Sequence, residues 1–458
     1  MHAMIIQFID PRQGDPRPEF SHTLGVLGAM LKQEGFPAVL TPLTGFQPDR
    51  VHQAVIEHRP QQVLVDLSPY SATAARRTIA DIAARYVLPV VVFGDLATAR
   101  PADSVSMPGV HAMAIGEYEH SVVELLRALR DGAGPAVVPG IWMKTESGLV
   151  RSEVRPLHED LDALPFPDRE LFDYHRTVAA TGEAGFQVAR GCPLWCGYCL
   201  NDWYMDLYEG RGEFVRRRTV ENVLAEIDQV RRRYDGVRKL CFYDHCFATD
   251  LAWLQRFAAQ YPRRVGLPYR CHVRLKCVSP EVARVLAGSG CREVRTLIAS
   301  GSRFIREEVQ SVHITDKQIV EAVRNLQAAG LRVVADVFVG SPYESEITIA
   351  DTLALVRRAA PDEIRPRVFY PCPGTRAAEI CADNGWISGR GEEDYWRQRS
   401  VLDMRSLPAR RIDEIAHKFL ALLNRRPRPS LGKILNKVLW SRSPRRSKPD
   451  ARRRAPDP

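Results

Sequence analysis

The stretch RGCPLWCGYC, residues 190–199, places three cysteines within eight residues, at Cys192, Cys196 and Cys199. The chain has ten cysteines, and none of them precedes Cys192. Three thiolates separated by three and two residues can bind one face of a cubane iron–sulfur cluster. Three cysteine ligands for four irons leave one iron open, and an open iron can bind a further molecule. We therefore expect these cysteines to be the ligands of a [4Fe–4S] cluster.

A zinc site, or three unrelated thiols, is the alternative that the residues leave open. Zinc in structural sites usually takes four ligands from paired cysteine knuckles. The other neighbouring cysteines, Cys241/Cys246 and Cys271/Cys277, do not form a clean second knuckle. The spacing therefore favours a cluster over zinc.

A series of alternating strand and helix patterns begins just before the cysteines. Strands are expected at 186–189, 239–243, 269–274, 293–298, 333–339 and 367–370, and helices at 220–234, 280–287, 316–329 and 347–359. Six βα units predict a partial (β/α)6 barrel of the TIM type, in which loops at the carboxyl ends of strands carry the chemistry. The cysteines follow the first of these strands directly.

The N-terminal third of the chain also alternates apolar runs with helical patterns. Strands are expected at 4–9, 62–67, 88–93 and 110–115, and helices at 24–33, 74–86 and from about 119 to 129. This βαβα order predicts a doubly wound, Rossmann-like α/β domain. No Gly-x-Gly-x-x-Gly follows a strand, so the case for a dinucleotide is weak.

The rest of the chain divides by composition. The predicted regions are 1–135 for the Rossmann-like domain, 136–180 for a proline-rich linker with a possible hairpin near residue 147, 181–376 for the barrel, 377–440 for a helical C-terminal region and 441–458 for a basic, disordered tail.

The cysteine stretch resembles the radical S-adenosylmethionine (SAM) superfamily, which has this spacing and an aromatic residue before the third cysteine. Tyr198 occupies the aromatic position. The resemblance implies that the open iron chelates the amino and carboxylate groups of SAM. An electron from the cluster then breaks the S–C5′ bond and releases a 5′-deoxyadenosyl radical. Tyr198 is accordingly expected to lie at the cofactor.

Three later segments are similar to the superfamily's pattern. In 240–247, Tyr243 and Asp244 are the residues expected to meet the methionyl amino group. In 297–302, Ser300 is a candidate SAM contact, but Ala299 replaces the usual Glu. In 340–345, Gly340 resembles the turn after the fifth strand.

The N-terminal domain resembles that of the cobalamin-binding subclass of the superfamily. The resemblance lies in the turn at Gly94, the motif GEYE at 116–119, and LPFPD at 164–168. Ser68, Gly94, Gly116 and Glu117 lie at or near predicted strand ends, where open sheets bind ligands. They are therefore candidate cobalamin contacts. The chain lacks an Asp-x-His-x-x-Gly, so no histidine of this motif would bind the cobalt. The alternative is a domain that binds nothing and only packs on the barrel.

Charge and hydropathy restrict the partners. The net charge of +9 comes from residues 425–458, which hold 12 Lys and Arg against two Asp, while residues 1–424 sum to −1. A specific nucleic-acid partner is therefore not expected. Instead we expect a small-molecule substrate and an external electron donor such as flavodoxin or ferredoxin. The N-terminus lacks the features of a signal peptide, which favours the cytosol. Residues 431–440 have helical spacing, which favours a terminal helix that packs on the barrel. Peripheral contact of this helix and the basic tail with an anionic membrane is the alternative.

The resemblance favours a cobalamin-dependent radical methyltransferase that acts on an unactivated carbon of a small-molecule or lipid-like substrate. A cobalamin-binding radical enzyme that cyclises, rearranges or oxidises its substrate remains the alternative. A methylthiotransferase is disfavoured because its N-terminal domain needs cysteines, and residues 1–191 have none. A zinc-bearing or cofactor-free binding protein is the alternative from another class.

We predict that anaerobic reconstitution loads about four iron and four sulfide per chain on the cubane model. Changing Cys192, Cys196 and Cys199 together to Ala should abolish the cluster's visible absorbance, because it removes all three thiolate ligands. Iron and sulfide analysis with the absorption spectrum provides the measurement. A triple variant that retains a full cluster would show that the ligands lie elsewhere.

Overall fold

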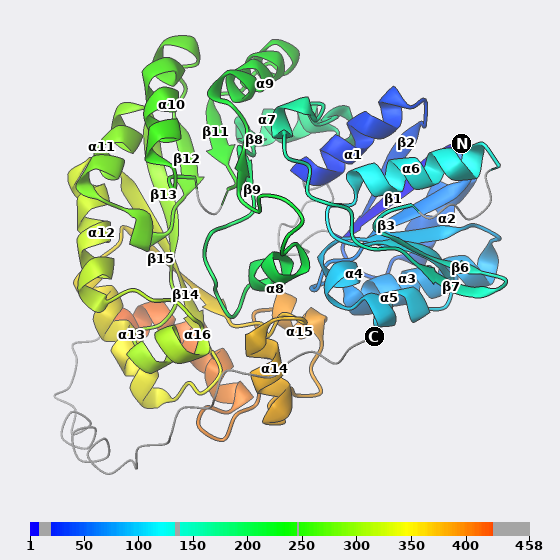
Figure 1. Ribbon diagram of the computed structural model, residues 1–458. Helices are drawn as coiled ribbons and strands as arrows, with labels where there is room; N and C mark the ends of the chain where they lie inside the picture. Colours follow the sequence, from blue (N-terminus) through cyan, green and yellow to red (C-terminus); the bar gives the residue numbers. More distant parts are fainter. Residues whose placement is uncertain (9–19, 133–137, 245–246, 425–458) are drawn as a thin grey trace.

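The computed structural model describes residues 1–8, 20–132, 138–244 and 247–424 (Figure 1). These residues build two sheets with parallel cores, each flanked by helices, and helices alone follow the second sheet. The predicted α/β class is therefore confirmed, with a doubly wound sheet first and six further parallel strands after it.

The N-terminal sheet has the strand order β2-β1-β3-β4-β5-β6-β7, and its first five strands are parallel. The strands are β1 (Ala3–Phe8), β2 (Ala38–Leu43), β3 (Gln62–Asp66), β4 (Val90–Phe93) and β5 (Val110–Ala114). The helices are α1 (His22–Gln33), α2 (Pro48–His58), α3 (Ala72–Arg85), α4 (Asp95–Ala99), α5 (Pro101–Ser106) and α6 (Glu119–Arg130). Alternate residues of β1 face opposite cores, Met4 and Ile6 toward α2 and α3, and Ala3 and Ile5 toward α1 and α6.

The sequence patterns missed β2 and α2. Pro42 lies inside β2 and weakens its strand pattern. A proline is tolerated there because β2 is the edge strand and pairs only with β1. The helix α2 has only three buried residues, Val51, Ala54 and Val55, so its apolar stripe is short.

The predicted hairpin near residue 147 forms, and it extends the N-terminal sheet. Strand β6 (Ile141–Thr145) pairs antiparallel with β5 and with β7 (Gly148–Arg151). Part of the stretch that looked like a linker therefore belongs to the first sheet, because Ile141 packs in the core beside α6.

The second sheet contains six parallel strands in chain order, from β8 at one edge to β15 at the other. They are β8 (Glu183–Phe186), β11 (Lys239–Phe242), β12 (Tyr269–His272), β13 (Cys291–Ile298), β14 (Arg332–Val339) and β15 (Glu363–Val368). The outer helices are α9 (Val220–Arg233), α10 (Leu251–Arg264), α11 (Pro280–Gly288), α12 (Asp316–Ala328) and α13 (Glu346–Ala359). This order is that of the predicted partial barrel.

The first and last barrel strands lie earlier than predicted. The prediction placed the first strand at 186–189, but β8 ends at Phe186, and Ala189 and Arg190 form a separate short strand, β9. Strand β9 pairs antiparallel with β10 (Arg216–Arg217). The last strand was predicted at 367–370, but β15 begins at Glu363, because its alternating charged residues interrupt the apolar pattern. The helix α10 was also missed, because Pro262 interrupts its pattern.

Two further helices lie near the start of the barrel, α7 (Tyr174–Thr181) before β8 and α8 (Leu200–Leu207) after the cysteines. The C-terminal helices, after β15, are α14 (Arg376–Asp383), α15 (Glu392–Trp396) and α16 (Ala409–Asn424). Ile412, Ile415 and Phe419 of α16 are buried in the barrel's core.

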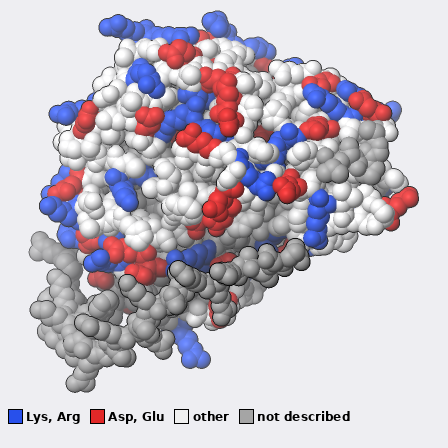
Figure 2. Space-filling view, viewed as in Figure 1, with Lys and Arg blue, Asp and Glu red and all other residues white. Residues whose placement is uncertain are grey.

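The surface of this body carries both charges. Acidic and basic side chains are interspersed over the face in Figure 2, which agrees with the near-zero charge of residues 1–424. Among the described residues, every helix is too short or too polar to cross a membrane. The segment 431–440 and the basic tail, for which packing on the barrel was favoured over membrane contact, lie outside the described residues.

Candidate functional site

The three cysteines occupy the loop between β9 and α8, and their side chains line one cavity of about 250 Å³. Cys196 is buried, and Cys192 and Cys199 are partly exposed. Burial raises the pKa of the Cys196 and Cys199 thiols, so their thiolate forms need a cationic partner. Three convergent thiols in a cavity of this kind suit an iron–sulfur cluster.

The backbone of this loop is fixed by hydrogen bonds. The Gly197 N–H donates to the carbonyl of Gln310 at 2.9 Å, and the Cys199 N–H donates to that of Cys196 at 2.8 Å. The Asn201 side-chain amide donates to the carbonyls of Cys192 and Leu194 at 2.9 and 3.2 Å. Asn201 was not singled out in the sequence, although its place two residues after Cys199 was a usable signal.

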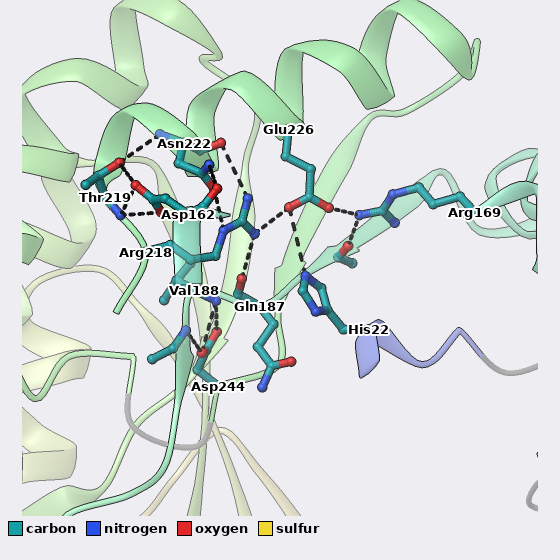
Figure 3. Close-up of polar contacts among 12 residues, drawn as sticks. His22, Asp162, Arg169, Gln187, Val188, Arg218, Thr219, Asn222, Glu226 and Asp244 are labelled. Atoms are coloured by element: carbon teal, nitrogen blue, oxygen red, sulfur yellow. Dashed lines mark hydrogen bonds and ion pairs between the residues drawn. The ribbon is translucent and has the colours of Figure 1, made fainter. Parts of the chain in front are cut away.

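Asp244 borders the cysteine cavity, but its carboxylate accepts hydrogen bonds from the backbone. The N–H groups of Val188 and Ala189 donate to it at 2.9 and 2.7 Å (Figure 3). Burial raises the pKa of Asp244 to about 6, against the opposing effect of these hydrogen bonds. The sequence had assigned this carboxylate to the methionyl amino group, whereas here it positions the chain that leads to the cysteines.

The two predicted aromatic residues lie where ligands can reach them. Tyr243 lines the cysteine cavity, and its side chain is partly exposed. A Cβ atom added to Gly185 would lie 2.2 Å from the Tyr243 ring, so the glycine makes room for this ring. Tyr198 lines a neighbouring cavity and packs edge-on against Phe338, with ring centroids 5.2 Å apart.

Ser300 and Gly340 are not among the residues that line either cavity. The Ser300 hydroxyl accepts a hydrogen bond from the Ser302 N–H at 3.2 Å and is fully buried. Gly340 has a φ of +88°, and an added Cβ would lie 2.7 Å from Ile412 of α16. Both residues have a packing role in this structure.

A second cavity, of about 410 Å³, extends from the cysteines to the N-terminal sheet. Pro69, Tyr70 and Asp95 line it from the carboxyl edge of that sheet, and Cys199 lines it from the loop. The barrel contributes His272, Arg274, Arg295, Asp336, Arg367 and Tyr370 among others. This space is the only one of the two cavities that borders both sheets.

The predicted residues of the N-terminal edge divide into two pairs. Ser68 and Gly94 serve local structure: the Ser68 hydroxyl accepts from the Tyr70 N–H at 3.2 Å, and a Cβ on Gly94 would lie 2.3 Å from Asp66 Oδ1. Gly116 and Glu117 instead contact the residues around the cysteines. A Cβ on Gly116 would lie 1.9 Å from the Tyr208 hydroxyl oxygen, and the Glu117 N–H donates to that oxygen at 2.6 Å.

Ion pairs complete this contact between the N-terminal edge and the cysteine loop. Arg190, two residues before Cys192, binds the carboxylates of Glu117 and Glu119. Arg216 of β10 binds Glu117 as well. On the other side of the loop, the Tyr204 hydroxyl of α8 donates to Asp95 at 3.0 Å.

The N-terminal sheet therefore binds the chain both before and after the cysteines, as the position of α8 in Figure 1 illustrates. The sequence analysis missed these partners. The sequence features that could have indicated these contacts were the basic run at residues 216–218 and Arg190, two residues before the first cysteine.

The sequence was compared with protein families and with known proteins. The family model of the radical SAM superfamily matches residues 186–356. An uncharacterized methyltransferase, PH0819, of Pyrococcus horikoshii is 24% identical over 324 residues, which cover 70% of this chain and 69% of that protein. A tRNA-2-methylthio-N(6)-dimethylallyladenosine synthase of Alkalilimnicola ehrlichii is 26% identical over 268 residues, and the match covers 54% of this chain and 56% of the synthase.

Two solved structures share the fold over most of the chain. The radical SAM methyltransferase TsrM of Kitasatospora setae, with cobalamin and a [4Fe–4S] cluster bound, has a TM-score of 0.65 at 18% identity and covers 85% of this chain and 79% of its own. The cobalamin-dependent SAM radical enzyme OxsB, with aqua-cobalamin and SAM bound, has a TM-score of 0.70 at 13% identity, covering 96% and 70%. The cysteine loop lies inside the segment 186–356, so the chain contains a domain that matches the radical SAM superfamily model.

Proposed function

We propose that the chain is a cobalamin-dependent radical methyltransferase that acts on an unactivated carbon of a small-molecule or lipid-like substrate. The observation that carries this proposal is the cavity of about 410 Å³ that borders both Cys199 and the carboxyl edge of the N-terminal sheet. Open parallel sheets bind ligands at this edge. A methyl carrier bound there would face the side of the barrel where a radical forms. The printed name of PH0819 and the cobalamin in TsrM and OxsB agree with this function.

We assign the cluster to Cys192, Cys196 and Cys199, whose thiols share one cavity. Tyr243 lines that cavity, and Tyr198 lines the adjoining one, so both are placed to contact SAM. When bound, the cluster and SAM supply the 5′-deoxyadenosyl radical, and cobalamin supplies the methyl group. The protein's own residues orient these groups and exclude water from them.

For cobalamin, the structure changes the candidate contacts. Pro69, Tyr70 and Asp95 face the shared cavity, whereas Gly116 and Glu117 contact Tyr208 and the arginines. In the described part of the N-terminal sheet, no histidine lines this cavity. A cobalt bound there would therefore lack an imidazole ligand from this sheet, as the missing Asp-x-His-x-x-Gly already implied.

A radical SAM enzyme takes its electron from an external donor, and we propose flavodoxin or ferredoxin for this role. Such a partner, and a cluster with cysteine ligands, fit the reducing cytosol.

We predict that purified protein binds hydroxocobalamin in roughly equal amount, with a base-off absorption spectrum. With cobalamin loaded and a strong reductant present, SAM should yield both S-adenosylhomocysteine and 5′-deoxyadenosine, which mass spectrometry quantifies. The first product reports methyl transfer and the second reports the radical. Formation of 5′-deoxyadenosine alone would instead support cyclisation, rearrangement or oxidation. A protein that binds no cobalamin would be a cobalamin-independent radical enzyme.

We also predict that Gly94→Val and Gly116→Val differ in their effect on iron. The atoms nearest to a Cβ added at Gly94 belong to Asp66 and Leu67 at the edge of the N-terminal sheet, so the first variant should weaken cobalamin binding and leave the iron content unchanged. The second displaces Tyr208, and with it α8 beside Cys199, so it should lower both. Both glycines have positive φ values, as does Gly35, which has no atom within 4 Å of an added Cβ.

Gly35→Val is therefore the control for backbone strain alone. Hydroxocobalamin titration and iron analysis of the three variants are the measurements. Full iron in Gly116→Val would show that the contact with Tyr208 does not support the cysteine loop.

A further inference from the structure

Residues 185–189 connect β8 to the cysteine loop, and side chains bind much of their backbone. The Gly185 carbonyl accepts from Arg169 at 2.8 Å, and the Gly185 N–H donates to the Tyr174 hydroxyl at 2.8 Å. The Gln187 carbonyl accepts from the Arg218 side chain at 3.0 Å. Gly185 lies in β8, an edge strand that pairs only with β11, and the chain leaves this sheet at Phe186, so these groups need partners from elsewhere.

The second half of the segment is bound in the same way. The Val188 carbonyl accepts from the backbone N–H of Arg218 at 2.9 Å. The N–H groups of Val188 and Ala189 donate to Asp244. Only two residues separate Ala189 from Cys192. The position of the first cysteine therefore depends on a short chain whose polar groups bind charged side chains.

A buried carboxylate joins the two arginines. Glu226 of α9 binds Arg169 at 2.7 Å and Arg218 at 2.5 Å (Figure 3). The side chain of Glu226 is 1% exposed, and those of Arg169 and Arg218 are 4% and 6% exposed. Burial alone would raise the pKa of Glu226, but Arg169 and Arg218 keep it below its ordinary value. The group is therefore a buried arginine–glutamate–arginine triad.

Stability alone does not explain such a triad. Removing three charges from water costs free energy, and well-packed apolar residues often stabilise a core equally well. Apolar residues, however, cannot donate hydrogen bonds to the backbone carbonyls of Gly185 and Gln187. The triad supplies donors to both carbonyls and orients each guanidinium through one shared carboxylate.

We infer that Glu226 is a positioning residue for the iron–sulfur cluster, acting through Arg169 and Arg218 on the chain that leads to Cys192. The inference rests on the proposed assignment of the cluster to the three cysteines. Glu226 is not among the residues that line either cavity, so it acts without touching a cofactor. It fixes the two donors that, together with Asp244, set the path of residues 185–189.

The test is Glu226→Gln, which keeps the shape of the side chain and removes its charge. In the apoprotein, amide hydrogen exchange in peptides covering 185–190 should speed up by about tenfold, because weaker contacts to the Gly185 and Gln187 carbonyls make local opening of this segment easier. In the reconstituted protein, the reduced cluster should show altered electron paramagnetic resonance g values and a shifted midpoint potential. Arg169→Lys is the second variant: it keeps the charge, loses the forked geometry, and should change the same quantities if Glu226→Gln fails to fold.

Two control variants lie on the same helix. Asp228 binds Arg264 at 2.7 Å near the surface, so Asp228→Asn should change neither exchange at 185–190 nor the spectrum. Val223 is fully buried, so Val223→Ala should lower the thermal midpoint and leave both local quantities unchanged. If Glu226→Gln and Arg169→Lys behave like Val223→Ala, the triad is only structural and the inference is wrong. A wild-type protein that loads no iron would instead overturn the proposed function, which the exchange measurement on apoprotein does not require.

Discussion

A loop that binds a cluster needs a backbone path that no sheet provides, and the buried polar groups along that path must find partners. In this chain the partners are ionised side chains from several distant segments. Asp244 binds two backbone N–H groups before the cysteines, and Glu226 orients the arginines that bind two carbonyls. Each unsatisfied group would cost about 1–3 kcal/mol. The position of the cysteine loop therefore depends on the pairing of these charged side chains.

The same constraint explains why the two sheets are joined so closely. Arg190 extends the bound segment by one residue and takes its carboxylates from the N-terminal sheet, at Glu117 and Glu119. Beyond the cysteines, Tyr204 and Tyr208 place α8 on the edge of that sheet. These contacts bring the edge of the first sheet beside Cys199, and residues from both sheets therefore line the cavity between them.

Sequence patterns predicted the fold class and the cysteine loop because both have local signals. Cysteine spacing and apolar runs are read within a few residues. The exceptions have local sequences that argue against the element: Pro42 lies in β2, which was missed, and Pro262 lies in α10, which was also missed. The alternating charges of β15 led to a prediction of this strand at 367–370, later than its observed position. In each case tertiary contacts stabilise a strand or helix that the local sequence disfavours.

The site was less predictable, because its contacts join residues far apart in the chain. Gly116 was singled out at a strand end, as expected of a ligand contact, but its missing side chain leaves space for Tyr208. Asp244 was expected to meet the methionyl amino group, but its partners in this structure are backbone groups, which have no sequence signature. Glu226 looked like any glutamate of an amphipathic helix.

The contact between Glu117 and Tyr208 spans 91 residues of chain, and this separation has a consequence during synthesis. At ordinary elongation rates a ribosome needs roughly 5 to 20 s to make that length. The whole first sheet, including its terminal hairpin, is synthesised before the partners of its carboxyl edge exist. Glu117 and Glu119 then remain hydrated until Arg190 and Arg216 emerge. Docking of the two halves and shaping of the cysteine loop are consequently one late event in the folding of the nascent chain.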